Sequence, residues 1–127
     1  ASGGNTLTFT ITGGTGRVLL GAVALSGAHQ STPGNTDSAT GSGTAITTPA
    51  ISSGVTEMVL DFVQFGVDDP AQTLAPGGGQ TELFELAAVN QSAGASSWKA
   101  GAASVSTAWT ASSSVGWNSV ITGVLPV

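Results

Sequence analysis

Hydrophobic and polar residues alternate along most of the chain with a period of two, the pattern of a β-strand that buries one face. The alternation is clearest at residues 6–12, where three apolar side chains fall between four threonines. It recurs at residues 56–67, which we predict to be the main core strand. Residues 17–26 are apolar on both faces, and this favours a central strand that is covered on both sides.

The rest of the chain divides into shorter alternating segments and into loops rich in glycine, proline, asparagine, aspartate and serine. We predict an edge strand at residues 44–52, where Pro49 lacks a backbone donor, and loops at residues 27–43 and 68–80. Residues 81–90 also fit a short helix, but the glycines that bracket them favour a strand. The remaining strands are predicted at residues 96–101, 103–112 and 115–125.

These segments predict seven or eight short strands and no amphipathic helix. Their natural closure is an antiparallel two-sheet β-sandwich, either a jelly-roll or an immunoglobulin-like arrangement. A length of 127 residues fits one domain that spans residues 1–127. We therefore expect an all-β protein with a single core.

The composition narrows the class of partner. Only 7% of the residues are charged, and two basic residues stand against seven acidic ones, for a net charge of −5. Nucleic-acid binding needs Lys and Arg to neutralise phosphates, so this balance argues against nucleic acid and against an anionic membrane surface. The longest apolar run, residues 18–25, is too short to span a membrane as a helix. A surface of hydroxyls and glycines indicates an extracellular, cell-surface or virion-surface protein that packs against neighbours.

Four stretches carry a family resemblance, namely "VLLGAVALSGAHQSTP", "SGVTEMVLDFVQFG", "GGGQTELFELAAV" and "WKAGAASVSTAWTASSSVGWNSVITGVLPV". They resemble Gly/Thr-rich β-sandwich modules of large secreted bacterial proteins and of phage structural proteins. In the turn at residues 26–33, His29 replaces the aspartate that is usual in those modules. The resemblance implies a non-catalytic structural or surface role. It also implies that the chain corresponds to the C-terminal two-thirds of the module, with further strands preceding it.

The side chains capable of acid–base or nucleophilic chemistry form no recognisable catalytic motif. His29 is the only histidine and shares a loop with Asp37, but the chain has no G-x-S-x-G nucleophile motif. A polar turn residue is the simpler interpretation of His29. We therefore expect that the protein is not an enzyme.

Acidic residues suggest two further kinds of site. Asp61, in the main core strand, would face a sheet edge, lie in a pocket or pair with one of the two basic residues, Arg17 and Lys99. Together with Glu82 and Glu85 it would supply the two carboxyl groups that glycoside hydrolysis needs. The chain has few other polar groups to hold a sugar substrate, which disfavours a glycosidase.

A calcium ion is the one cofactor that the sequence suggests. Asp68 and Asp69 begin a loop, and carboxylates together with backbone carbonyls are the oxygen ligands that Ca²⁺ favours. The spacing matches no calcium-binding motif, and an aspartate before a proline also caps turns. The expected cofactor is therefore none, with Ca²⁺ at this pair as the alternative.

Three tryptophans lie in the C-terminal third of the chain, at Trp98, Trp109 and Trp117. Aromatic rings on a sandwich face stack on sugars, so these residues suggest a carbohydrate-binding or adhesion module of a larger secreted protein. Burial of Trp109 and Trp117 in the core is the competing interpretation, and Trp98 is the best candidate for exposure.

The leading functional hypothesis is a structural subunit that assembles with copies of itself. Charge is one device that keeps exposed strand edges from pairing, and this chain has little charge. Assembly into a filament or shell by edge pairing or strand donation is therefore expected. The predicted assembly strand consists of Thr6, Leu7, Thr8, Phe9, Thr10 and Ile11.

Overall fold

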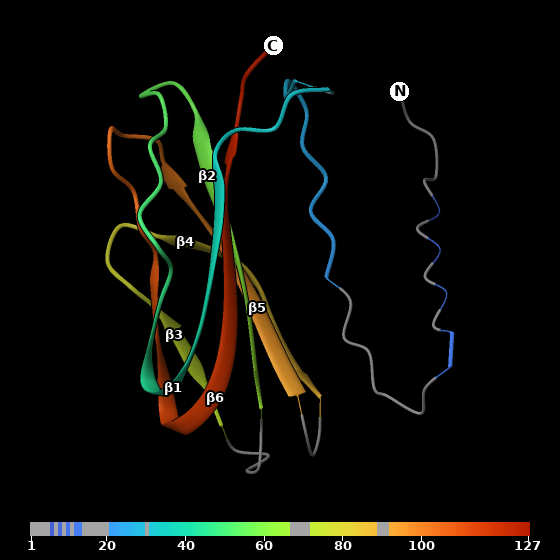
Figure 1. Cartoon of the computed structure of the whole chain (residues 1–127), viewed down its shortest axis with the longest axis vertical. Helices are drawn as coiled ribbons and strands as arrows, with labels where there is room; N and C mark the ends of the chain where they lie inside the picture. Colours follow the sequence, from blue (N-terminus) through green and yellow to red (C-terminus); the bar gives the residue numbers. More distant parts are fainter. Residues whose placement is uncertain are drawn as a thin grey trace.

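The computed structural model describes Thr6, Thr8, Thr10 and residues 12–13, 21–29, 31–66, 72–88 and 92–127. These residues contain six β-strands and no helix (Figure 1). In chain order the strands are β1 (Thr36–Thr47), β2 (Met58–Gly66), β3 (Leu74–Pro76), β4 (Thr81–Ala88), β5 (Ser92–Ala100) and β6 (Ala108–Val124).

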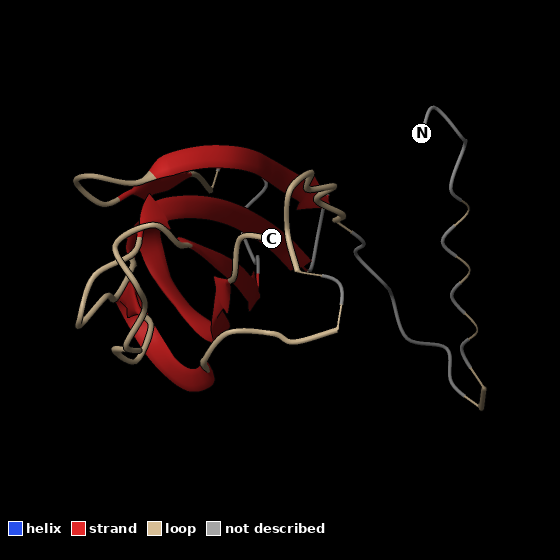
Figure 2. Cartoon of the chain, turned by 90° about the horizontal axis from the view of Figure 1, so that it is seen from above, coloured by secondary structure: helices blue, strands red, loops and turns tan. Residues whose placement is uncertain are grey.

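All six strands belong to one antiparallel sheet in the order β1-β6-β2-β5-β4, with β3 also paired to β6. β6 is the longest strand and changes partners along its length. Its first part lies between β1 and β3, and its last part lies between β1 and β2. Seen from above, the sheet curves around an interior (Figure 2). The backbone N–H of Leu74 in β3 donates to Glu85 Oε1 in β4 at 3.2 Å, which links these two strands.

The prediction of an antiparallel all-β fold is confirmed. The strands predicted at residues 56–67 and 81–90 are present as β2 and β4, so the helical alternative for the latter is wrong. The described strands form one sheet of six rather than seven or eight strands, and a separate second sheet is not among them. Residues 21–26 of the predicted central strand at 17–26 are described and are not in a strand.

Two strand boundaries differ from the sequence prediction for physical reasons. The segments predicted at residues 103–112 and 115–125 are joined in β6, because β1 pairs with both parts. The second half of the predicted loop at 27–43 is instead the start of β1. Its small residues allow a close approach: a Cβ on Gly41 would lie 2.5 Å from Cζ2 of Trp117. The small residues that resemble a loop in the sequence leave room for the indole ring of Trp117.

The interior contains two clusters of buried apolar residues. The larger cluster surrounds Trp109 and Phe65, which are 1% and 0% exposed, and Trp117 packs against it. The smaller cluster consists of Ile51, Val59, Val105 and Ile121. Two members of this cluster, Ile51 and Val105, form an isolated bridge that ties the loop after β1 to the loop before β6.

Candidate functional site

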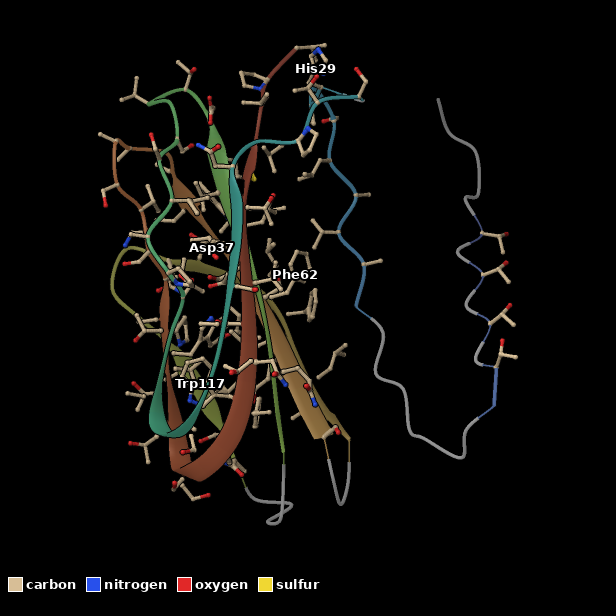
Figure 3. The ribbon with its side chains drawn as sticks, viewed as in Figure 1. His29, Asp37, Phe62 and Trp117 are labelled. Atoms are coloured by element: carbon tan, nitrogen blue, oxygen red, sulfur yellow. The ribbon has the colours of Figure 1, made fainter. Side chains whose placement is uncertain are left out.

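The residues considered for catalysis are not brought together. His29 is exposed, and its Nδ1 accepts hydrogen bonds from the backbone N–H groups of Ser31 (3.5 Å) and Thr32 (3.2 Å). Asp37 is exposed on β1 and accepts from the N–H of Ser38 at 2.8 Å. The two side chains lie well apart (Figure 3). Each of them orders its own stretch of backbone, and within the described part of the chain they share no hydrogen-bond partner.

The three carboxylates weighed for glycoside hydrolysis lie in different environments. Asp61 is fully buried, Glu85 is half-buried and Glu82 is exposed. Asp61 is 0% exposed, so the three carboxylates do not all face solvent as a sugar site requires. The described residues contain no group of three or more His, Cys, Asp or Glu side chains placed to hold a metal ion. Asp68 and Asp69, the suggested calcium pair, lie outside the described residues.

Asp61 is the centre of a buried polar network between β2, β5 and β6. Its Oδ1 accepts from the backbone N–H of Ser97 at 2.7 Å. Its Oδ2 accepts from Ser97 Oγ at 2.9 Å and from Trp109 Nε1 at 3.0 Å, with Gln80 Nε2 at 3.5 Å. Four donors therefore satisfy a carboxylate that water does not reach, and this is the arrangement that makes burial of a carboxylate tolerable.

Gln80 extends this network to the chain before β4. Its Nε2 donates to Ser97 Oγ at 2.9 Å, and its Oε1 accepts from the backbone N–H of Ala108 at 2.8 Å. Sequence analysis suggested Arg17 or Lys99 as the partner of Asp61. Lys99 instead donates to the backbone carbonyl of Ser106 at 3.4 Å, and Arg17 lies outside the described residues. The sequence shows Asp61 as a single carboxylate in an apolar strand. Its hydrogen-bond partners follow from strand register, which the sequence does not show.

The three tryptophans do not form one platform. Trp109 is 1% exposed and lies in the core, as its competing interpretation predicted. Trp98 and Trp117 are half-buried. Trp98 lies opposite Leu60 in the ladder, whereas Trp117 lies opposite Phe65, and these two β2 positions point to opposite faces because their spacing is odd. Sugar binding stays a prediction for Trp98 and Trp117.

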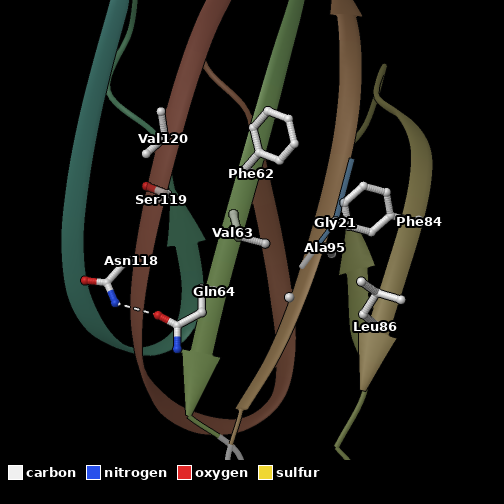
Figure 4. A pocket seen from close by; sticks show the side chains of 11 residues that line it. Gly21, Phe62, Val63, Gln64, Phe84, Leu86, Ala95, Asn118, Ser119 and Val120 are labelled. Carbon is white, nitrogen blue, oxygen red and sulfur yellow. Dashed lines mark hydrogen bonds between the residues drawn. The ribbon is translucent and has the colours of Figure 1, made fainter. Parts of the chain in front are cut away.

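An apolar groove lies on the outer face of the sheet, over β4, β5, β2 and β6, with a volume of about 280 Å³. The side chains of Phe62, Phe84, Leu86 and Val120 line it (Figure 4). Its lining residues include no charged side chain, and Val120 is 40% exposed. At one end Asn118 Nδ2 donates to Gln64 Oε1 at 2.9 Å. Neither the register nor the pairing of these strands is visible in sequence, so sequence analysis missed this surface.

The other unusual surface is the free edge of β1. This strand pairs only with β6 among the described residues, so its opposite edge has no strand partner there. Nine of its twelve residues are exposed, and Asp37 is the one charged residue among them. Residues 36–43 pair with β6 in regular register before the irregularity between Gly43 and Ala45. The edge is therefore long, regular and almost uncharged.

The predicted assembly strand is described only at its threonines. Thr6, Thr8 and Thr10 are exposed. Leu7, Phe9 and Ile11 lie outside the described residues.

No protein-family model matches the sequence, and no curated protein or solved structure is similar to it. Among the described residues, no helix is long and apolar enough to cross a membrane.

Proposed function

We propose that this protein is a non-catalytic structural subunit that assembles with copies of itself through strand contacts. We place it outside the cell, on a cell or virion surface, where a low-charge β-protein is held in a larger assembly. We also propose that the sheet is one layer of the two-sheet sandwich expected from the sequence. Strands from a neighbouring copy or segment would supply the second layer.

The free edge of β1 carries this proposal. An edge strand presents unpaired backbone N–H and C=O groups, and natural monomers protect such edges with lysines, prolines, bulges or covering loops. Residues 36–43 have one acidic side chain, no lysine and no proline. Eight regularly paired residues are enough to offer a neighbouring strand a continuous ladder.

The opposite edge of the sheet provides a contrast. Among the described residues β4 pairs only with β5, but it has two glutamates, Glu82 and Glu85, and a register irregularity between Glu82 and Phe84. Both features discourage pairing with another strand. The two edges thus differ in the property that matters for assembly, and β1 is the edge left open to a partner.

A lysine on the β1 edge tests this proposal. In the variant Thr40→Lys, a charge stands on the regular part of the edge, and copies that pair there bring like charges together. We expect association to weaken about fivefold, since opposed like charges cost up to about 1 kcal/mol. Sedimentation velocity over a concentration series measures the change in mean assembly mass.

Thr110→Lys is the matched control. Thr110 is also exposed, but it lies on β6 with a strand on each side, Ala45 of β1 and Ala75 of β3. The Thr110→Lys variant alters the net charge by the same amount as Thr40→Lys and leaves the free edge of β1 unchanged. Equal assembly of the two variants would show that the β1 edge is not an interface.

A further inference from the structure

We infer that Ser97 and Gln80 join in an intramolecular ester bond, which the protein forms by itself with Asp61 as the base. The reaction occurs once in each chain and releases ammonia, so it modifies a structural protein and is not enzymatic turnover. The inference does not depend on the proposed self-assembly, because the three side chains contact one another within one chain.

Ser97 and Asp61 supply the nucleophile and the base. The two residues lie opposite each other in the ladder between β5 and β2, and both are 0% exposed. Ser97 Oγ donates to Asp61 Oδ2 at 2.9 Å, so the carboxylate is placed to take the hydroxyl proton. The backbone N–H of Ser97 and the indole of Trp109 hold the carboxylate in this orientation. A hydroxyl group bonded to an oriented base is the usual form of an activated nucleophile.

Gln80 places a carboxamide group beside this hydroxyl. Its Nε2 donates to Ser97 Oγ at 2.9 Å and lies 3.5 Å from Asp61 Oδ2. The carbonyl carbon is bonded to Nε2, so a small rotation of the carboxamide brings that carbon to the hydroxyl oxygen. Gln80 Oε1 accepts from the backbone N–H of Ala108 at 2.8 Å. This donor polarises the carbonyl and stabilises the oxyanion that forms on attack.

The turn before β4 holds Gln80 in this position. The backbone N–H of Gln80 donates to the carbonyl of Gly77 at 3.3 Å, and the N–H of Gly77 donates to the carbonyl of Ala108 at 2.8 Å. The turn is therefore attached to the start of β6 at the same residue that binds Gln80 Oε1. Reactants that the fold holds together avoid the entropy cost of meeting, which is the main advantage of an intramolecular reaction.

The reaction balances without a co-reactant. Ser97 Oγ forms a bond to Cδ of Gln80, and the hydroxyl proton passes to Asp61 Oδ2. The Cδ–Nε2 bond then breaks, and the proton passes from Asp61 to Nε2, which leaves as ammonia. In the product Asp61 still accepts from the N–H of Ser97 and from Trp109 Nε1. The burial of Ser97 and Asp61 keeps water away from the ester.

Mass spectrometry of the full, unmodified chain tests this inference. We expect the denatured chain to be lighter than its sequence mass by one molecule of ammonia. A glutamate-specific protease cuts after Glu82 and Glu85, which lie between the two joined residues. We expect the peptides that contain Gln80 and Ser97 to stay joined after this cleavage. Hydroxylamine, which cleaves esters and leaves amides intact, should separate them.

Ser97→Ala removes the nucleophile, and we expect this variant to have its full sequence mass. The matched control is Ser96→Ala. Ser96 is also 0% exposed, but its Oγ donates to the backbone carbonyl of Asp61 at 2.6 Å and not to the carboxylate. The control should lose ammonia as the unmodified chain does. Asp61→Asn should react at least about a hundredfold more slowly, the lower end of what a general base contributes.

Four results would overturn the inference. A folded chain that keeps its sequence mass after long incubation at neutral pH would show that the contacts only satisfy a buried carboxylate. Loss of ammonia without joined peptides would assign the loss to another site, such as an asparagine that cyclises. Conversion of Gln80 to glutamate would show that the ester does not persist. Equal loss of ammonia by Ser96→Ala and Ser97→Ala would exclude Ser97 as the nucleophile.

Discussion

Replacing Asp61 with alanine is expected to lower the free energy of unfolding by about 3–5 kcal/mol, because several buried donors lose their acceptor. Three side-chain or backbone donors would lose their acceptor at once: Ser97 N, Trp109 Nε1 and Ser97 Oγ. A buried donor left without a partner costs about 1–3 kcal/mol. The network joins β2, β5 and β6, so its loss affects the centre of the sheet.

Urea denaturation followed by tryptophan fluorescence measures this effect. Asp61→Asn keeps the volume but turns an amide NH₂ toward the existing donors, and we expect it also to be destabilised. The matched control is Asp37→Asn, which changes an exposed aspartate bonded only to the N–H of Ser38 and should shift stability by less than about 0.5 kcal/mol. Equal stability of Asp61→Ala and the unmodified protein would show that the network does not hold these strands together.

Replacing Trp109 with alanine is the second large loss, also expected at about 3–5 kcal/mol. The ring is 1% exposed and lies in the larger cluster beside Ile46, Phe65 and Leu74. Its removal leaves a cavity between β1, β3 and β2, and it removes the donor to Asp61 Oδ2. The variant therefore loses both core packing and one donor of the Asp61 network.

Trp98→Ala is the control, because it removes a side chain of the same size from a less buried position. Trp98 is half-buried, so truncating it removes fewer contacts and should cost clearly less than Trp109→Ala in the same urea experiment. The double variant Asp61→Ala/Trp109→Ala should lose less free energy of unfolding than the sum of the two single variants, because the indole of Trp109 and the carboxylate of Asp61 are hydrogen-bond partners. Additive losses would mean that the 3.0 Å contact contributes nothing of its own.

The period-two pattern was sufficient to predict β2, because its alternate side chains lie in the core. β4 was predicted as a strand from the glycines that bracket it. The period-two pattern failed for β1, where the side that meets Trp117 carries Gly41 and offers no hydrophobic signal. Composition alone cannot distinguish such a strand from a loop, since small residues serve both. The unbroken length of β6 likewise depends on β1 pairing along both of its parts, which no local pattern contains.

The candidate sites also depend on pairing between distant strands, which no local sequence pattern shows. Asp61 was recognisable as a charged residue in an apolar strand, but the choice of Ser97 and Trp109 over a basic partner depends on register between distant strands. The groove depends on Gly94 falling between Gln64 and Leu86, and on the irregularity in β4 that precedes this alignment.

The most direct test of self-assembly is the mass of the purified, unmodified chain in solution. We predict that sedimentation velocity across a concentration series shows species heavier than the monomer that grow with concentration, and that electron microscopy shows filaments or closed shells. A single monomeric species at every concentration, with no assemblies on the grid, would contradict the account.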